Sequence, residues 1–190
     1  MKPPIENNAS TGAEKFRELI VYLSRLSEGD DNFGSVKLNK LLFYIDFMAY
    51  TRWGRSVTGK VYQKLEQGPA PRPLVPVLRQ LEEERAVALQ KRNYYGLTQK
   101  RPVALREPVL SGFAPEEIDL IHYVVDKCRH LDAKTISDQS HRFTGWKIAD
   151  LHETIPYEIA LIGSRSPTTR EEEIGRELDS LATACLGRNA

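Results

Sequence analysis

The sequence has little of what marks membrane, secreted or dedicated nucleic-acid-binding proteins. Among 190 residues there are only two cysteines, Cys128 and Cys185, far too few for a disulfide framework. No apolar run approaches the roughly 20 residues that a membrane-spanning helix needs. Lys and Arg total 27 against 26 Asp and Glu, so the net charge is only +1, whereas DNA-binding domains are usually far more basic. We therefore expect a cytoplasmic chain with reduced thiols and no membrane association.

Sequence motifs of cofactor chemistry are also missing. There is no glycine-rich phosphate loop followed by lysine, no Gly-x-Gly-x-x-Gly and no His-Glu-x-x-His. His122, Asp126, Cys128 and His130 lie close together in sequence, but their spacing matches no known zinc ligand set. Cys128 falls on the apolar face of a predicted helix, where a cysteine more often acts as a small hydrophobe than as a nucleophile. We predict no catalysis, no cofactor and no metal.

The composition is that of a globular domain. Hydrophobic residues make up 41% of the chain and charged residues 28%, and a chain of this length can bury a core without staples. Apolar residues recur at helical spacing in seven segments. They predict a compact helical domain, mainly α with a small β-hairpin or short sheet (α+β), with helices over residues 14–26, 35–53, 74–84, 115–128, 132–136, 156–161 and 168–186.

The remaining segments predict the β structure and the connections. β-branched residues over 55–65 indicate a short strand or extended stretch, and 87–105 predicts a hairpin that turns at 93–96. Proline-rich residues 67–73 can be neither helix nor central strand, so we expect a rigid connector. Residues 141–156 have no clear periodicity, and we expect them to be irregular.

Three parts of the chain follow from this pattern. Residues 1–13 are predicted to be a flexible lead-in, 14–163 the folded domain, and 164–190 a linker with a C-terminal amphipathic helix. The apolar stripe of that helix is Ile174, Leu178, Leu181 and Cys185. Such a helix can lie in a partner's groove, or it can pack on its own domain or on a twin subunit.

Asp46 stands out because it lies in the most apolar of the predicted helices. A buried carboxylate must be paired or hydrogen-bonded, or it becomes neutral. It can therefore be a general acid or base, or a structural group that holds neighbouring backbone. No second catalytic group lies near it in sequence, which favours the structural role.

The predicted hairpin has a basic rim and an aromatic tip. These features suit contact with phosphates and stacking on bases, but a solvated hairpin has the same composition. The candidate nucleic-acid contacts are Lys91, Arg92, Tyr94, Tyr95, Lys100 and Arg101.

Several segments in order resemble the Panacea domain, the SocA-like antitoxin family that includes many phage-associated proteins. They are KLNKLLFYIDF at 37–47, GRSVTGKVY at 54–62, GPAP at 68–71, SHRFTGW at 140–146 and IPYEIAL at 155–161. The resemblance implies a mostly helical domain with a small β element and an antitoxin role. Carried over by position, the motif residues are Asp46, Tyr62, Gly68, Pro69, His141, Trp146, Pro156, Tyr157 and Glu158.

The leading hypothesis is an antitoxin that neutralises a cognate protein toxin, by direct inhibition or by delivery to a cellular protease. The motif residues are then either part of the contact surface or a folding signature. A DNA-binding regulator of a phage or mobile element, using the hairpin at 91–101, is the alternative. An enzyme centred on Asp46 or His141 is a third, less favoured reading, and assembly with a second copy stays open.

Overall fold

A computed structural model of the chain describes residues 12–94, 96–162 and 170. The helices of the described part are α1 (Gly12–Leu26), α2 (Ser35–Trp53), α3 (Leu74–Glu83), α4 (Pro115–Cys128), α5 (Ala133–Ser140), α6 (Thr144–Ile148) and the short 3-10 helix η1 (Tyr157–Leu161). The strands are β1 (Tyr62–Leu65), β2 (Gly68–Pro71), β3 (Val87–Tyr94), β4 (Leu97–Ala104) and β5 (Thr154–Ile155). A mainly helical α+β fold is confirmed. The predicted C-terminal helix lies outside the described residues.

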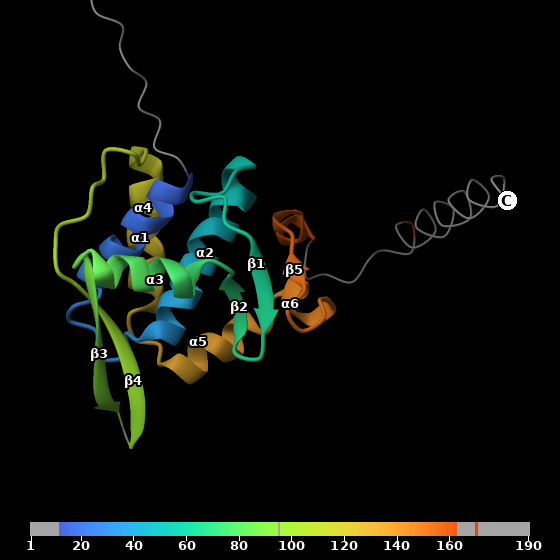
Figure 1. Cartoon of the computed structure of the whole chain (residues 1–190). Coiled ribbons are helices and arrows are strands. Elements are labelled where there is room, and N and C mark those ends of the chain that lie inside the picture. The colour runs from blue at the N-terminus through green and yellow to red at the C-terminus, as the bar shows by residue number, and fades with distance from the viewer. Residues whose placement is uncertain (1–11, 95, 163–169, 171–190) are drawn as a thin grey trace, which may run out of the picture.

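Helix α2 runs through the middle of the molecule, as its apolar character predicts (Figure 1). One side of it, including Leu38, Leu41 and Ile45, joins the main core with α1, α3 and α4. Phe43 and Phe47 on another side join a smaller core with Tyr62 and residues of the α6–η1 region. The helix ends at Gly54, whose positive φ of 68° lets its N–H donate to the Tyr50 carbonyl.

A small antiparallel sheet has the strand order β2-β1-β5. The prediction of a connector over 67–73 is wrong, because Gly68–Pro71 forms the edge strand β2. The Arg72 N–H donates to the Val61 carbonyl at 2.9 Å. In this register the backbone N–H and C=O groups of the even-numbered residues of β2 point toward β1. The backbone nitrogens of Pro69 and Pro71, which carry no hydrogen, therefore lie on the side away from β1, where the sheet needs no donor. An edge strand tolerates proline in this arrangement.

The region at 141–156 is also more regular than predicted. It contains α6, of five residues, and β5, of two, which pairs with β1 at Tyr62 and Gln63. Elements this short carry too few residues to show a periodicity. The predicted helix after Pro156 is present as η1. The helix predicted over 132–136 is present as the longer α5, and the Asp132 side chain caps it by accepting from the Thr135 N–H.

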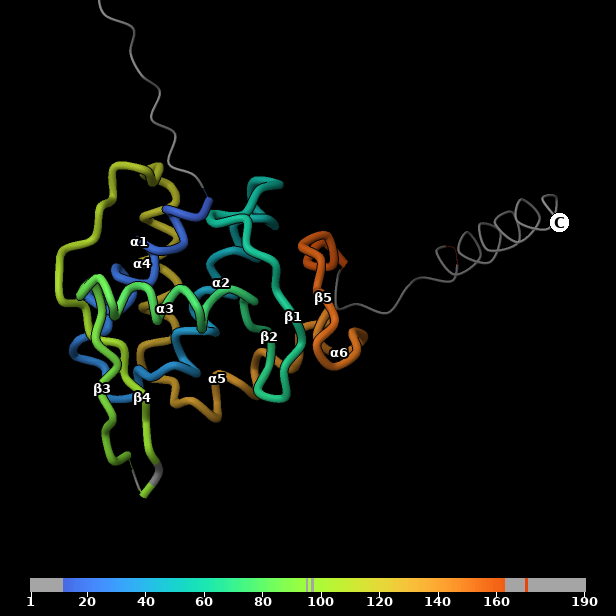
Figure 2. The backbone as a smooth tube through the Cα atoms, viewed as in Figure 1, coloured from blue at the N-terminus to red at the C-terminus, as the bar shows by residue number. Residues whose placement is uncertain are grey.

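The hairpin β3–β4 is confirmed, and it projects from the helical body (Figure 2). At the other end of the domain, α1 begins at Gly12, inside the range predicted as lead-in. Within the described residues, no helix has the length and apolarity needed to cross a membrane.

Candidate functional site

Asp46 of α2 is fully buried and acts as a hydrogen-bond hub. Its Oδ1 accepts the Thr58 N–H at 2.8 Å, and its Oδ2 accepts the Thr58 hydroxyl and the Tyr62 hydroxyl, the latter at 2.8 Å. These bonds tie the middle of α2 to the loop before β1 and to β1 itself. Burial raises the pKa of the Asp46 carboxyl, and the hydrogen bonds from Thr58 and Tyr62 oppose that rise.

Tyr157 connects the same cluster to η1. Its hydroxyl donates to the Lys60 carbonyl at 2.7 Å, and its ring contacts Phe47 and Tyr62. Burial is the main cause that raises the pKa of the Tyr157 hydroxyl, and the Asp46 charge adds to it. Three motif residues far apart in sequence therefore meet around one carboxylate.

The neighbouring motif residues lie at the rim of this cluster. Pro156 precedes η1 and is exposed. Glu158 is also exposed, and its carboxylate accepts the Tyr50 hydroxyl at 3.2 Å. These two positions are open to a partner, whereas Asp46 and Tyr62 are not.

Gly68 and Pro69 form a close contact between β2, α2 and α5. Gly68 has a φ of 101°, and a Cβ there would lie 2.3 Å from the Ser140 Oγ and 2.7 Å from the Lys40 Nζ. The Lys40 ammonium donates to the Pro69 carbonyl at 3.1 Å. Only glycine fits this position, because the space and the backbone conformation both exclude a side chain.

Lys40 is a site residue that the sequence analysis missed. Its side chain is buried, and burial lowers its pKa to about 7. Lys37, one turn earlier, is equally buried but has three partners: the Asp30 carboxylate and the carbonyls of Arg129 and Leu131. The available signal was the one used for Asp46, namely charged residues within a helix that is apolar on most sides.

His141 and Trp146 stack on each other, with ring centroids 4.0 Å apart and planes at 13°. The Trp146 indole N–H donates to the Leu65 carbonyl at 2.9 Å, which fastens α6 to β1. The Nε2 atom of His141 is buried and has no hydrogen-bond partner among the described residues. Trp146 thus has a scaffold role, while His141 retains unused hydrogen-bonding capacity.

His141 lies at one wall of a cleft of about 830 Å³. The other walls come from the start of α2, the β1–β2 turn, α5 and the hairpin. Residues that line it include Ser35, Gln67, Thr98 and Lys134. Segments distant in sequence thus meet in one concave surface that is large enough for part of another protein chain.

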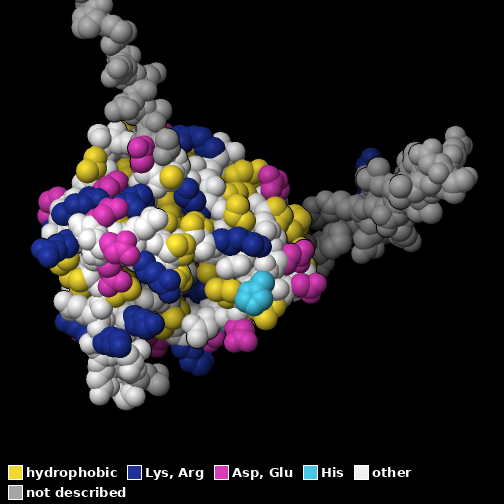
Figure 3. Space-filling model, viewed as in Figure 1, with side chains coloured by type: hydrophobic (Ala, Val, Ile, Leu, Met, Phe, Trp, Pro, Cys, Tyr) yellow, Lys and Arg dark blue, Asp and Glu magenta, His cyan; other side chains and the backbone are white. Residues whose placement is uncertain are grey.

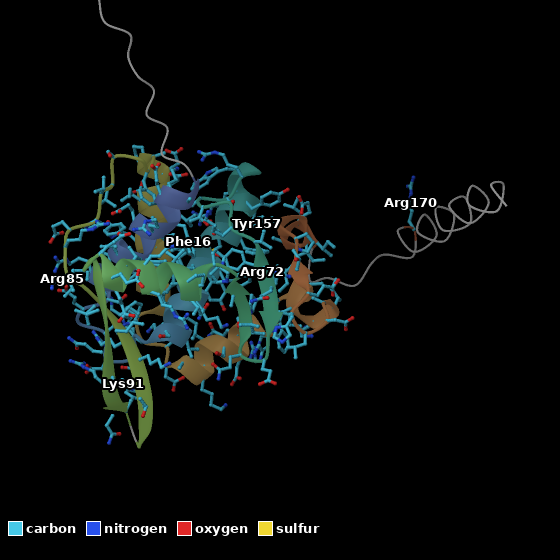
Figure 4. All side chains as sticks on the ribbon, in the orientation of Figure 1. Phe16, Arg72, Arg85, Lys91, Tyr157 and Arg170 are labelled. Carbon is cyan, nitrogen blue, oxygen red and sulfur yellow. The ribbon has the colours of Figure 1, made fainter. Side chains whose placement is uncertain are left out.

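The hairpin is only partly available as a nucleic-acid contact. Lys91, Arg92 and Lys100 are exposed, and Lys91 is on the outer part of the hairpin, well apart from Tyr157 (Figure 4). The prediction is wrong for Arg101, because its buried guanidinium donates to the carbonyls of Ser27, Glu28, Asp30 and Phe33.

The aromatic tip differs from the prediction as well. The half-buried Tyr94 donates its hydroxyl to the Asn32 side chain, so it packs against the domain and is not a free stacking platform. Tyr95 lies outside the described residues. On the face drawn in Figure 3, Lys and Arg side chains are interspersed with Asp and Glu and form no single basic field.

Three of the four residues considered as metal ligands are engaged elsewhere in the fold. The His122 ring shares a hydrogen bond with the Tyr22 hydroxyl at 2.7 Å, Asp126 pairs with Arg129, and Cys128 is buried in the main core. Burial raises the pKa of the Cys128 thiol to about 11, so it is protonated at neutral pH. The described residues contain no group of three or more His, Cys, Asp or Glu that could hold a metal ion.

Comparison with protein-family models identifies a family for this chain. No curated protein and no solved structure matches the chain. The family model described as antitoxin SocA-like, Panacea domain, matches residues 38–147, which is more than half of the 190 residues. That range contains Asp46, Tyr62, Gly68, His141 and Trp146 of the geometry above, and it ends before η1. The chain therefore belongs to the antitoxin SocA-like family through its Panacea domain.

Proposed function

We propose that this chain is an antitoxin that binds a cognate protein toxin and neutralises it. The observation that carries the proposal is the family match over residues 38–147. Neutralisation follows either from covering the toxin's active surface or from delivering the toxin to a cellular protease. Binding without catalysis is supported by Asp46, whose carboxylate is sealed from solvent and already accepts three hydrogen bonds.

The toxin-binding surface that we propose is the cleft beside His141. Its walls carry exposed polar side chains such as Gln67 and Thr98. These side chains can donate hydrogen bonds to, and accept them from, a partner segment that enters the cleft, which suits a specific contact.

The test begins with the genes next to this one. Each neighbouring reading frame is expressed alone and together with this chain, and growth is measured. We expect one neighbour to be toxic alone and harmless with this chain. If no neighbour is toxic, or if the toxicity persists on co-expression, the proposal fails. Repeating the rescue in a reconstituted system without protease separates direct inhibition from delivery.

Two matched substitutions test the surface. Gln67→Arg places a bulky cation in the cleft, whereas Gln90→Arg makes the same change at an exposed hairpin position that does not line it. We expect the first to weaken toxin binding at least tenfold and the second to change it less than twofold. Equal effects would remove the cleft from the proposal.

A DNA-binding role is the second candidate, and one observation favours it. Lys91 and Lys100 pair directly across the hairpin, and neither has an acidic partner among the residues described. Like charges opposite each other are destabilising unless an anion lies between them. A gel shift with DNA upstream of this gene, measured over a range of salt concentrations, tests it. Binding that weakens with salt and is lost in Lys91→Gln would support this role.

A further inference from the structure

A second concave surface lies at the other end of α2. This apolar pocket, of about 290 Å³, is bounded by Tyr44, Met48 and Thr51 of α2, by Gln139 of α5, and by Phe143 and Ala160. The pocket therefore reaches η1, within two residues of Ile162, where the continuously described part of the chain ends. Phe47, which also contacts Tyr157, lines this pocket as well, but the pocket shares no lining residue with the proposed toxin cleft.

Exposed apolar side chains gather in the segment next to this pocket. The described residues include nine exposed large hydrophobic side chains, of which four fall within residues 148–162. Each of the four is at least half exposed: Ile148 at 66%, Leu151 at 50%, Leu161 at 61% and Ile162 at 56%. A concentration of this kind usually indicates a surface that another element covers.

The chain itself supplies a suitable element. The sequence after Arg170 places Ile174, Leu178 and Leu181 on one side at helical spacing. Residues 163–169 span at most roughly 25 Å when extended. A tether this short holds the apolar stripe near the pocket at an effective concentration in the millimolar range.

Charge favours the same pairing. Arg142 precedes the pocket residue Phe143, Lys147 precedes the exposed Ile148, and neither cation has an ion-pair partner within the described part of the chain. The C-terminal segment carries three consecutive acidic residues at 171–173. Opposite charges at the edge of an apolar contact set its register.

We propose that residues 170–186 dock through the face of Ile174, Leu178 and Leu181 onto the apolar pocket and the exposed α6–η1 surface of their own domain. The docking is a property of the free chain, so it holds or fails independently of toxin neutralisation.

Photo-crosslinking in the full chain tests the docking. A benzophenone amino acid replaces Gln139, which lines the pocket, and in a control it replaces Lys134, which lies on the same helix but lines the large cleft instead. We expect the probe at 139 to crosslink to residues 170–186 of the same molecule. The probe at 134 should crosslink there at least tenfold less.

Two double variants in the segment carry the same charge change. Leu178→Asp with Leu181→Asp acidifies the apolar stripe, and Ser180→Asp with Thr183→Asp acidifies the opposite side of the predicted helix. We expect the first pair to lower crosslinking from position 139 at least tenfold and the second less than twofold, with unchanged circular dichroism. Arg142→Glu with Lys147→Glu should also weaken it at low salt, independently of the tail variants.

Mixing light and heavy isotope-labelled chains identifies the occupant. Crosslinks within one mass label support the proposal. Crosslinks between labels would assign the pocket to a second copy and overturn it. Crosslinks that form only with an added toxin, or no crosslink to residues 170–186, would overturn it as well.

Discussion

Replacing Asp46 tests whether the buried carboxylate is a structural hub. Asp46→Ala removes the acceptor of three buried hydrogen bonds, two from Thr58 and one from Tyr62. Asp46→Asn keeps the shape and one carbonyl oxygen for the Thr58 N–H. The amide nitrogen then faces two hydroxyl groups, each of which can turn to accept. The two substitutions therefore separate loss of acceptors from loss of charge.

The structure sets the size of the effect. A buried donor left without an acceptor costs about 1–3 kcal/mol, and the Thr58 hydroxyl can rotate to another acceptor. Two donors that stay unsatisfied give a loss of about 2–6 kcal/mol for Asp46→Ala. For Asp46→Asn we expect about 1 kcal/mol, the value of one ordinary hydrogen bond. The Ala variant thus loses a large share of the typical total stability of about 5–15 kcal/mol.

The pH dependence follows from the raised pKa of Asp46. A carboxyl with a raised folded-state pKa contributes stability below its unfolded pKa of about 3.9 and loses it as the pH rises through the folded pKa. Asparagine does not titrate. The stability advantage of the wild type over Asp46→Asn should therefore be largest near pH 4 and shrink toward neutral pH.

Urea unfolding followed by circular dichroism measures all three proteins over this pH range. If the free energy of unfolding of Asp46→Ala lies within about 1 kcal/mol of the wild-type value, the structural role of Asp46 as a hub is refuted. Such a loss is smaller than the expected cost of about 2–6 kcal/mol for two unsatisfied donors. A stability gap between wild type and Asp46→Asn that grows with pH would refute the dominance of burial over hydrogen bonding at this carboxyl.

Three further predictions concern other buried contacts. Because the pKa of Lys40 is lowered to about 7, its contribution to stability falls as the pH drops from about 10 to about 7. This change in the free energy of unfolding is at most about 1.4 kcal/mol per pH unit. Lys40→Met should flatten it, as measured by thermal unfolding at several pH values. Gly68→Ala should destabilise by about 2 kcal/mol or more through its clash with Ser140 and its positive φ, measured by urea titration; a neutral effect would contradict the close packing. Arg101→Gln should cost about 2–4 kcal/mol and Lys91→Gln under about 0.5 kcal/mol, and equal costs in the same assay would show that Arg101 does not hold the loop.

The long helices and the hairpin were predictable because each has many residues with one period. Helix α2 and helix α4 show apolar stripes over several turns, and the turn at 93–96 interrupts two alternating segments. β2 was missed because its prolines argue against a strand in general, and they are compatible with an edge strand only in one orientation. That orientation depends on the partner strand β1, which the local sequence does not specify.

The candidate site was predictable in its members and not in its arrangement. Asp46 was identifiable as a buried carboxylate, but its partners Thr58 and Tyr62 depend on how the loop after α2 folds back. Arg101 lies in a basic stretch of the hairpin sequence, which suggested an exposed position. The alternation of side chains along β4 instead directs it to the inner face, where it donates to carbonyls of the 27–33 loop. Burial of a charged side chain is decided by tertiary contacts, which a local pattern of charges does not contain.

The pairing of β5 with β1 sets how much chain the domain needs. The family match stops at residue 147, but Thr154 and Ile155 complete the sheet beside Tyr62 and Gln63. A fragment cut at the end of that match leaves β1 with one open flank of unpaired N–H and C=O groups, and it removes Tyr157 from the aspartate cluster. Open strand flanks recruit other chains, so the natural boundary for expression lies beyond η1, after Leu161.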